Sequence, residues 1–95
     1  MAVKNPFRIA LIGAGRIGKV HAKNIHEHAD TVIHYVVDPH AESAEALALE
    51  VGASVVDTDV VFSDDAIDAV VICSATPTHS DLIERGLLSG KAVFL

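Results

Sequence analysis

Residues 7–18 read FRIALIGAGRIG, an apolar run that leads directly into three glycines spaced Gly13-x-Gly15-x-x-Gly18. A buried strand followed by a glycine-rich turn and a helix is the arrangement that binds the pyrophosphate of a dinucleotide. Gly13 permits the tight turn, Gly15 lets the backbone approach a phosphate, and Gly18 allows the helix to pack closely on the strand. The helix that starts here would direct free N–H groups and the positive end of its dipole at the phosphates.

An acidic residue stands where this arrangement needs one. A second apolar run, residues 31–37 (TVIHYVV), ends at Asp38, about 20 residues after the last glycine. A carboxylate there accepts hydrogen bonds from the adenosine ribose and repels a 2′-phosphate. Since residues 39–42 contain no Lys or Arg, we expect NAD as the cofactor rather than NADP. With Pro39 next, Asp38 also suits the N-cap of the following helix, and both roles can coexist.

Composition narrows the class of protein. The chain has 95 residues, enough for one domain (1–95), and 51% of them are hydrophobic, which argues against disorder. The net charge of −6 without a Lys/Arg cluster makes nucleic acid and acidic membranes unexpected partners. A single cysteine excludes an internal disulfide and fits a reducing compartment. We find no signal peptide or membrane span and expect a cytoplasmic location.

Strand-like and helix-like patterns alternate along the chain. The predicted strands are 7–12, 31–37, 53–56, 69–73 and 92–95, and the predicted helices are 16–29, 39–51, a short one within 57–65, and 79–88. This alternation predicts a Rossmann-type α/β fold, a doubly wound parallel sheet of order 3-2-1-4-5, with the chain ending in the fifth strand. The apolar helix positions expected to face the sheet are Ile17, Val20 and Ile25, then Ala44, Leu47, Ala48 and Val51, then Leu82, Ile83 and Leu87.

The turn SATPT, residues 74–78, follows the fourth strand at the edge where ligands of such sheets bind. We expect it to lie against the ribose and nicotinamide of the cofactor. A nucleophilic role for Cys73 or Ser74 is disfavoured, because no base is fixed near them. The Thr-Pro-Thr stretch with Asp81 also fits a helix start with a capping box. His79 suits either helix-start packing or a place beside the cofactor.

Arg16 and four of the histidines lie in the predicted helix and strand that follow the glycine-rich turn. Arg16 can add positive charge at the phosphates or remain solvated. Three of the six histidines, His21, His26 and His28, share one predicted helix, but spacings of five and two do not place ligands on one face. We therefore expect no metal site. His34 is expected to be a packed or edge residue of its strand.

Four segments together resemble the N-terminal domain of the Gfo/Idh/MocA oxidoreductases: GRIGKVHAKNI from Gly15, the strand-end Asp38, DAVVICSATPTH from Asp68 and GKAVFL from Gly90. The resemblance covers essentially the whole chain. By position, it assigns the pyrophosphate to Gly13, Gly15, Arg16, Ile17 and Gly18, the adenosine ribose to Asp38, and the nicotinamide ribose to Ser74, Ala75, Thr76, Pro77 and His79.

The resemblance also implies an activity. Members of the family with these motifs oxidise a secondary alcohol of a cyclic polyol or sugar to a ketone, and myo-inositol is the expected substrate. In the family, a Glu-Lys-Pro motif follows the fifth strand, and a second domain supplies a catalytic Asp and His. None of these precedes Leu95, so we expect a catalytically silent portion of a longer, homo-oligomeric enzyme. A stand-alone NAD(H)-binding regulatory module and a truncated product without a role remain open.

Overall fold

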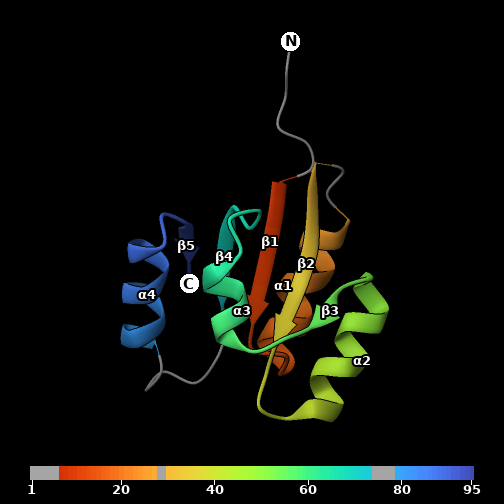
Figure 1. Cartoon of the computed structure of the whole chain (residues 1–95). Coiled ribbons are helices and arrows are strands. Elements are labelled where there is room, and N and C mark those ends of the chain that lie inside the picture. Colours follow the sequence, from red (N-terminus) through yellow and green to blue (C-terminus); the bar gives the residue numbers. More distant parts are fainter. Residues whose placement is uncertain (1–6, 28–29, 74–78) are drawn as a thin grey trace.

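The computed structural model describes residues 7–27, 30–73 and 79–95, and for His79 the backbone alone. The strands are β1 (Phe7–Ile12), β2 (Thr31–Val37), β3 (Ser54–Val55), β4 (Ala69–Ile72) and β5 (Ala92–Phe94). The helices are α1 (Arg16–His26), α2 (Ala41–Val51), α3 (Thr58–Ser63) and α4 (His79–Leu88). All strand pairs are parallel, and the sheet order is β3-β2-β1-β4-β5 (Figure 1). The predicted Rossmann-type sheet is confirmed.

The sheet has a hydrophobic core on each face. Successive side chains of a strand point to opposite faces, so Ile9 and Leu11 of β1 pack with α1 and α2, whereas Ala10 and Ile12 pack with α3 and α4. Figure 1 accordingly shows α1 behind the sheet and α3 in front of it. Burial on both faces explains why β1 and β4 are nearly continuous apolar runs.

The α2 helix packs as its sequence pattern predicts. Its four expected core residues are all buried: Ala44, Leu47, Ala48 and Val51. Gly52 ends the helix in the left-handed conformation, with φ of 75°, which glycine adopts without strain.

The start of α2 differs from the prediction. Helix α2 begins at Ala41, so Pro39 is not its first residue and Asp38 is not its N-cap. The N-cap is His40, whose Nδ1 accepts a 3.3 Å hydrogen bond from the Ser43 N–H. Asp38 is not the cap because the backbone is still extended at His40 (φ −86°, ψ 96°), two residues later, and the helix begins only after that point.

The α1 helix meets the sheet through small residues rather than through its large ones. Gly18 and Ala22 are its buried residues, whereas Ile17 and Val20 are 60% and 54% exposed, so their predicted packing is wrong. The helix lies too close to β1 at Gly18 for a larger side chain to fit between them. Of the three predicted inward residues, only Ile25 packs partly against the core.

The α4 helix shows the same effect on the other face. Leu82 is buried, Ile83 packs beside it, and Leu87 is 65% exposed, contrary to the prediction. The close approach here is at Gly86, where an added Cβ would lie 2.5 Å from Cγ2 of Val93 on β5.

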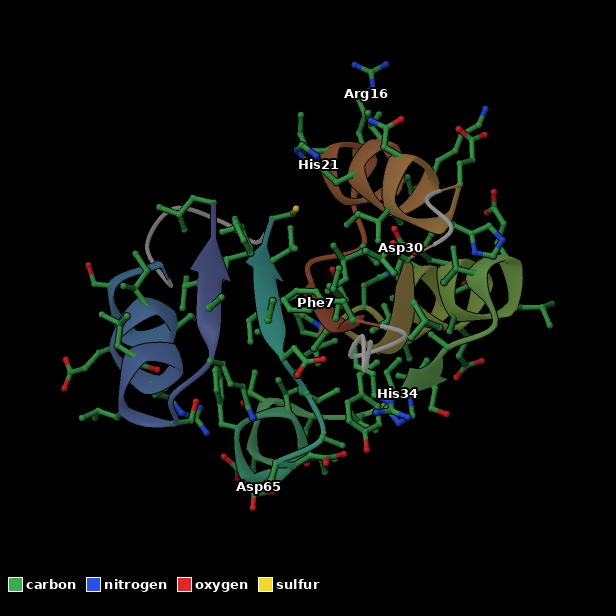
Figure 2. All side chains as sticks on the ribbon, turned by 90° about the horizontal axis from the view of Figure 1, so that it is seen from above. Phe7, Arg16, His21, Asp30, His34 and Asp65 are labelled. Atoms are coloured by element: carbon green, nitrogen blue, oxygen red, sulfur yellow. The ribbon has the colours of Figure 1, made fainter. Side chains whose placement is uncertain are left out.

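An irregular register in β2 places His34 on the surface. Ile9 pairs with Ile33 and Ala10 pairs with Tyr35, so His34 is the extra residue of a β-bulge. Its ring is exposed and lies edge-on to Tyr35, with ring centroids 4.6 Å apart. Figure 2 shows it on the side of the sheet opposite to Arg16. Periodicity alone could not reveal this extra residue.

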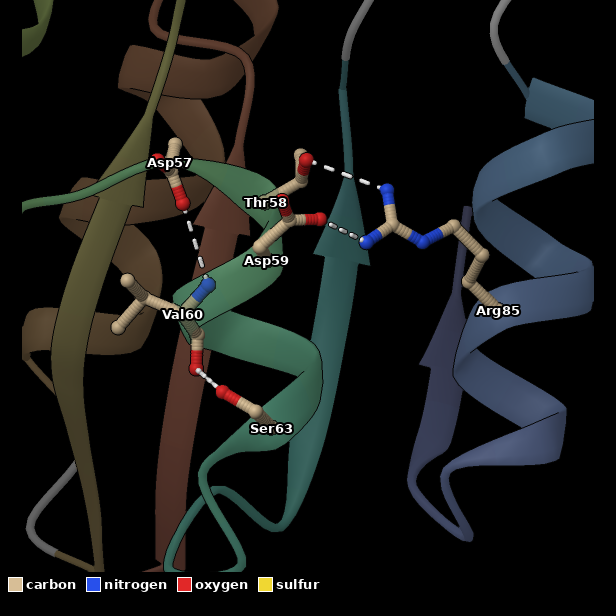
Figure 3. Close-up of polar contacts among 6 residues, drawn as sticks. All are labelled: Asp57, Thr58, Asp59, Val60, Ser63 and Arg85. Atoms are coloured by element: carbon tan, nitrogen blue, oxygen red, sulfur yellow. Dashed lines mark hydrogen bonds and ion pairs between the residues drawn. The ribbon is translucent and has the colours of Figure 1, made fainter.

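Helix α3 lies within the predicted range and contacts α4 through one arginine. Arg85 Nη2 lies 2.6 Å from Asp59 Oδ1, Nη1 donates to Thr58 Oγ1 at 3.2 Å, and the guanidinium lies over the Phe62 ring (Figure 3). Because Asp59 is 86% exposed, the ion pair itself contributes little to stability. The contact with Phe62 and the bond to Thr58 connect α4 with α3.

Removing the Lys91 ammonium is expected to destabilise the fold. Lys91 is only 6% exposed, and its Nζ donates to the carbonyls of Asp64 (2.7 Å) and Ile67 (3.2 Å). Lys91→Met keeps the packing but removes both bonds, which should lower the free energy of unfolding by about 1–3 kcal/mol. Urea denaturation measures this loss. Exposed Lys23→Met is the matched control, and equal losses in the two variants would contradict the account.

Acid is expected to weaken a contact between β2 and the loop after α3. The Tyr35 hydroxyl donates to Asp64 Oδ2 at 2.7 Å, and this bond, followed by that from the Ala66 N–H, lowers the pKa of Asp64. Because the folded state favours the carboxylate, the contribution is present above the ordinary carboxyl pKa of about 4. It is lost as the pH falls through the lower pKa of the folded state.

Tyr35→Phe should therefore be less stable than the wild type near neutral pH, and the difference should shrink below about pH 4. Urea denaturation of both proteins across that range measures the difference directly. A difference that stays constant down to the most acid pH would show that Asp64 ionisation does not contribute.

Candidate dinucleotide-binding site

The carboxyl ends of β1, β2 and β4 lie side by side at one edge of the sheet. Beyond β1, the Gly13 N–H donates to the Val37 carbonyl of β2, and the Cys73 N–H beyond β4 donates to the Ile12 carbonyl, both at 2.7 Å. These bonds extend the sheet just past its strands and bring the glycine-rich turn next to the ends of β2 and β4. Ligands of open α/β sheets bind at such an edge.

The three glycines of the turn have different surroundings. Gly13 has a φ of 106°, a conformation that side chains with a Cβ rarely adopt. At Gly18, an added Cβ would lie 2.0 Å from the Gly13 carbonyl oxygen, so only glycine allows α1 to approach β1 this closely. Gly15 is exposed, and an added Cβ would have no atom of residues 7–27, 30–73 or 80–95 within 4 Å. Gly13 and Gly18 therefore shape the turn, and Gly15 leaves open space above it.

The N-terminus of α1 opens onto this space. Gly15 is the N-cap, no side chain caps the helix, and the first turn contains no acidic residue. The first intrahelical bond runs from the Lys19 N–H to the Gly15 carbonyl (2.9 Å), so the N–H groups of the first turn have no partner within the helix. Unpaired N–H groups and the positive helix dipole together favour an anion such as a phosphate.

Arg16 and Ile17 stand at this helix start and are both exposed. Figure 2 shows the Arg16 side chain extending from α1 away from the sheet. The two alternatives for Arg16, a phosphate contact or a solvated charge, therefore both stay compatible with its position.

Asp38 connects the end of β2 to the glycine-rich turn. Its Oδ2 accepts a 2.7 Å hydrogen bond from the Ala14 N–H, and its Oδ1 accepts a 2.8 Å bond from the His40 N–H. The carboxylate is half-buried beside the turn. Each oxygen of a carboxylate can accept a second hydrogen bond, so ribose hydroxyls can bind without displacing these donors.

No pattern in the sequence predicts the two bonds of Asp38. The Ala14 N–H becomes its partner because parallel pairing of β1 and β2 brings together residues 24 positions apart. His40 is an uncommon N-cap residue and carries no helix-start signal of its own.

The fourth strand brings Cys73 to the same edge. Its side chain is half-buried, and burial raises the pKa of the Cys73 thiol. The thiol therefore stays protonated near neutral pH, which disfavours a nucleophilic role. The other residues predicted on this side, Ser74, Ala75, Thr76 and Pro77, lie outside the described residues, as does the side chain of His79, the first residue of α4.

Ranges 7–27, 30–73 and 79–95 hold no group of three or more His, Cys, Asp or Glu residues placed to bind a metal ion. Within the same ranges, none of the helices has the length and apolar character needed to cross a membrane.

Comparison with known proteins gives a consistent result. The model of the Gfo/Idh/MocA family, an oxidoreductase family with an NAD-binding Rossmann fold, matches residues 7–95. Inositol 2-dehydrogenase of Rhizobium meliloti (strain 1021) is 49% identical over 87 residues, which are 92% of this chain and 26% of that protein.

Two solved structures show the same architecture. Myo-inositol dehydrogenase of Corynebacterium glutamicum superposes with a TM-score of 0.87 at 47% identity, covering 93% of this chain and 27% of the other. Scyllo-inositol dehydrogenase of Lactobacillus casei, with bound NAD(H) and scyllo-inositol, has a TM-score of 0.84 at 29% identity and covers 94% and 27%.

The chain thus spans about a quarter of the length of the proteins it resembles. The family match, in contrast, extends over nearly all of its own residues. The glycine-rich turn, the acid at the end of β2 and the sheet order fall within the matched range. This chain belongs to the Gfo/Idh/MocA oxidoreductase family and is an NAD-binding Rossmann domain of it.

Proposed function

We propose that this chain is the NAD-binding part of a dehydrogenase that oxidises a secondary alcohol of a cyclic polyol, with myo-inositol as the substrate. The observation that carries the nucleotide assignment is the contrast between two glycines. Gly18 is closed in by the Gly13 carbonyl, whereas Gly15 faces open space beside the uncapped start of α1. Such a space fits a pyrophosphate next to main-chain N–H donors.

The proposed roles follow from position. The main-chain N–H groups from Gly15 to Gly18 bind the pyrophosphate, with Gly13 shaping the turn and Arg16 and Ile17 bordering it. The Asp38 carboxylate accepts the hydroxyls of the adenosine ribose. Bound NAD⁺ supplies the hydride acceptor, its nicotinamide ring.

We infer further that the nicotinamide half of NAD lies toward the end of β4. The residues assigned to it are Ser74, Ala75, Thr76, Pro77 and His79. Support comes from Cys73, which precedes them and pairs through its N–H with Ile12 beside the glycine-rich turn. The closeness of these strand ends supports the proposal that both halves of one dinucleotide bind at the same edge of the sheet.

The substrate assignment is supported by relatives. The Rhizobium meliloti relative is named inositol 2-dehydrogenase, and the Lactobacillus casei structure contains scyllo-inositol. Since this chain matches only about a quarter of each, groups that bind the polyol and accept its hydroxyl proton would come from outside the matched region. The chain by itself is expected to bind NAD without oxidising inositol.

A chimeric enzyme tests this proposal. The 87 matched residues of the Rhizobium meliloti protein are replaced by the corresponding residues of this chain, and NADH formation from myo-inositol is followed by absorbance. We expect inositol-dependent NADH formation that is lost when Gly15 is replaced. Because the polyol-binding groups of the chimera come from the Rhizobium meliloti protein, a folded chimera that binds NAD but transfers no hydride would contradict the proposal that this domain positions NAD for such an enzyme. NADH formation by the 95-residue chain alone would also contradict the account.

A further inference from the structure

A side-chain hydrogen bond follows the last main-chain bond between β1 and β2. The last main-chain bond runs from the Gly13 N–H to the Val37 carbonyl, at 2.7 Å. The next donor along the turn, the Ala14 N–H, binds Oδ2 of Asp38, also at 2.7 Å. The Asp38 carboxylate therefore ties the residue after the last ladder bond to the end of β2, within the glycine-rich turn.

The Ala14 N–H needs this partner. Ala14 is fully buried, with 0% of its surface exposed, and buried main-chain N–H groups are almost always hydrogen-bonded. Without the carboxylate, the N–H would have to find another acceptor, and the turn would have to move to reach one. Such a movement would displace Gly15 and the start of α1, which lie directly after Ala14.

The carboxylate is itself held in one orientation. Its Oδ1 accepts the His40 N–H at 2.8 Å, and the His40 ring is fixed to the first turn of α2 by Nδ1 contacts with Ser43 (2.7 Å to Oγ and 3.3 Å to N). Two N–H donors from different turns thus fix the orientation of the Asp38 carboxylate, one at each oxygen. We name these bonds from Ala14 and His40 the Asp38 link.

We propose that Asp38 is a positioning residue for the pyrophosphate-binding turn, in addition to binding the ribose. Through the Asp38 link, it holds the turn in its binding conformation before NAD arrives. This inference rests on the proposed function, because the turn is taken as the site of NAD. The two roles of Asp38 have different consequences. If Asp38 positions the turn, its loss should weaken binding even of a nucleotide whose ribose lacks hydroxyls for Asp38 to bind.

Amide exchange measures the link without any nucleotide. In the nucleotide-free wild type, NMR should show the Ala14 amide protected relative to the exposed first turn of α1. In Asp38→Ala, the Ala14 amide should exchange at least about tenfold faster, with Leu11 in the centre of β1 unchanged. Asp57→Ala removes another carboxylate that accepts a main-chain N–H, that of Val60, and should leave Ala14 unchanged.

If Asp38→Ala does not fold, the wild type alone decides the point. An Ala14 amide that exchanges as fast as that of Arg16 would show that the link is not formed in solution. If Asp38→Ala does fold, an Ala14 amide that exchanges equally fast in the variant and in the wild type would also overturn the proposal.

A nucleotide analogue then separates the two roles of Asp38. In an NAD analogue whose adenosine ribose lacks the 2′ and 3′ hydroxyls, the ribose bonds are absent by design. Asp38→Ala should bind this analogue about three- to tenfold more weakly than the wild type does, the size of one lost hydrogen bond. Removing a negative charge near phosphates would by itself strengthen binding, so weakening cannot be an electrostatic effect.

Unchanged or stronger binding of the analogue would limit Asp38 to the ribose and overturn the inference. Asp57→Ala should bind the analogue like the wild type. If the wild type binds no NAD at all, the proposed function fails, and amide exchange at Ala14 still decides whether the Asp38 link exists.

Discussion

Gly18→Ala should lower the free energy of unfolding by roughly 3 kcal/mol or more, and the remaining folded protein should not bind NAD. The added Cβ would lie 2.0 Å from the Gly13 carbonyl oxygen, which belongs to the backbone and cannot rotate away. The clash can be relieved only if α1 moves away from the sheet, and this movement would break the contacts of Ala22 with the core. Chemical denaturation with matched NAD titration measures both effects.

The control for Gly18→Ala is the same change at Gly15, three residues earlier. Gly15 has ordinary extended dihedral angles, φ −76° and ψ −165°, and none of the residues that the structure describes has an atom within 4 Å of its added Cβ. A Gly18→Ala protein as stable as Gly15→Ala would show that the close contact between α1 and β1 does not exist in solution.

Gly15→Ala should have the opposite profile: unchanged stability and at least about a tenfold loss of NAD affinity, which is about 1.4 kcal/mol. The methyl group would project into the open space beside the start of α1, where the pyrophosphate is proposed to lie. Calorimetric titration with NAD gives the affinity, and the denaturation curve of the same sample shows that the fold is intact. Undiminished NAD binding by this variant would place the phosphates elsewhere.

Local chemistry explains which parts of the fold could be predicted. The apolar run of β1, the glycine spacing and the acid after β2 each carry their own signal, because buried strands and tight turns restrict residue types directly. Helix α2 was likewise predictable from its apolar spacing, since Ala44 and Leu47 fall on one stripe and Gly52 ends it.

Contacts between distant segments account for the errors. The inward face of α1 depends on how closely the helix approaches β1, which Gly18 permits and which turns Ile17 outward. Helix α2 is an exception, since its late start at Ala41 has a local cause: the backbone is still extended at His40. The bulge at His34 depends on the pairing of β1 with β2, and it cannot be predicted from the alternation of apolar and polar residues within β2.

The candidate site also has parts that the sequence predicts and parts that it does not. Its phosphate side could be predicted because backbone geometry requires Gly13 and Gly18, and Gly15 stands between them at the expected spacing. The acid could be predicted from its distance along the chain, although not its main-chain partners. The nicotinamide side, at 74–77 and His79, remains a prediction from family resemblance.

Calorimetric titration of this chain with NAD and with NADP tests the central claim most directly. Asp38 is fixed beside the turn by its two main-chain donors, and residues 39–42 contain no Lys or Arg to receive a 2′-phosphate. We predict saturable binding of NAD, with NADP bound at least about tenfold more weakly. Equal affinity for the two nucleotides would contradict the role of Asp38, and absence of binding to either would contradict the assignment of this domain as an NAD site.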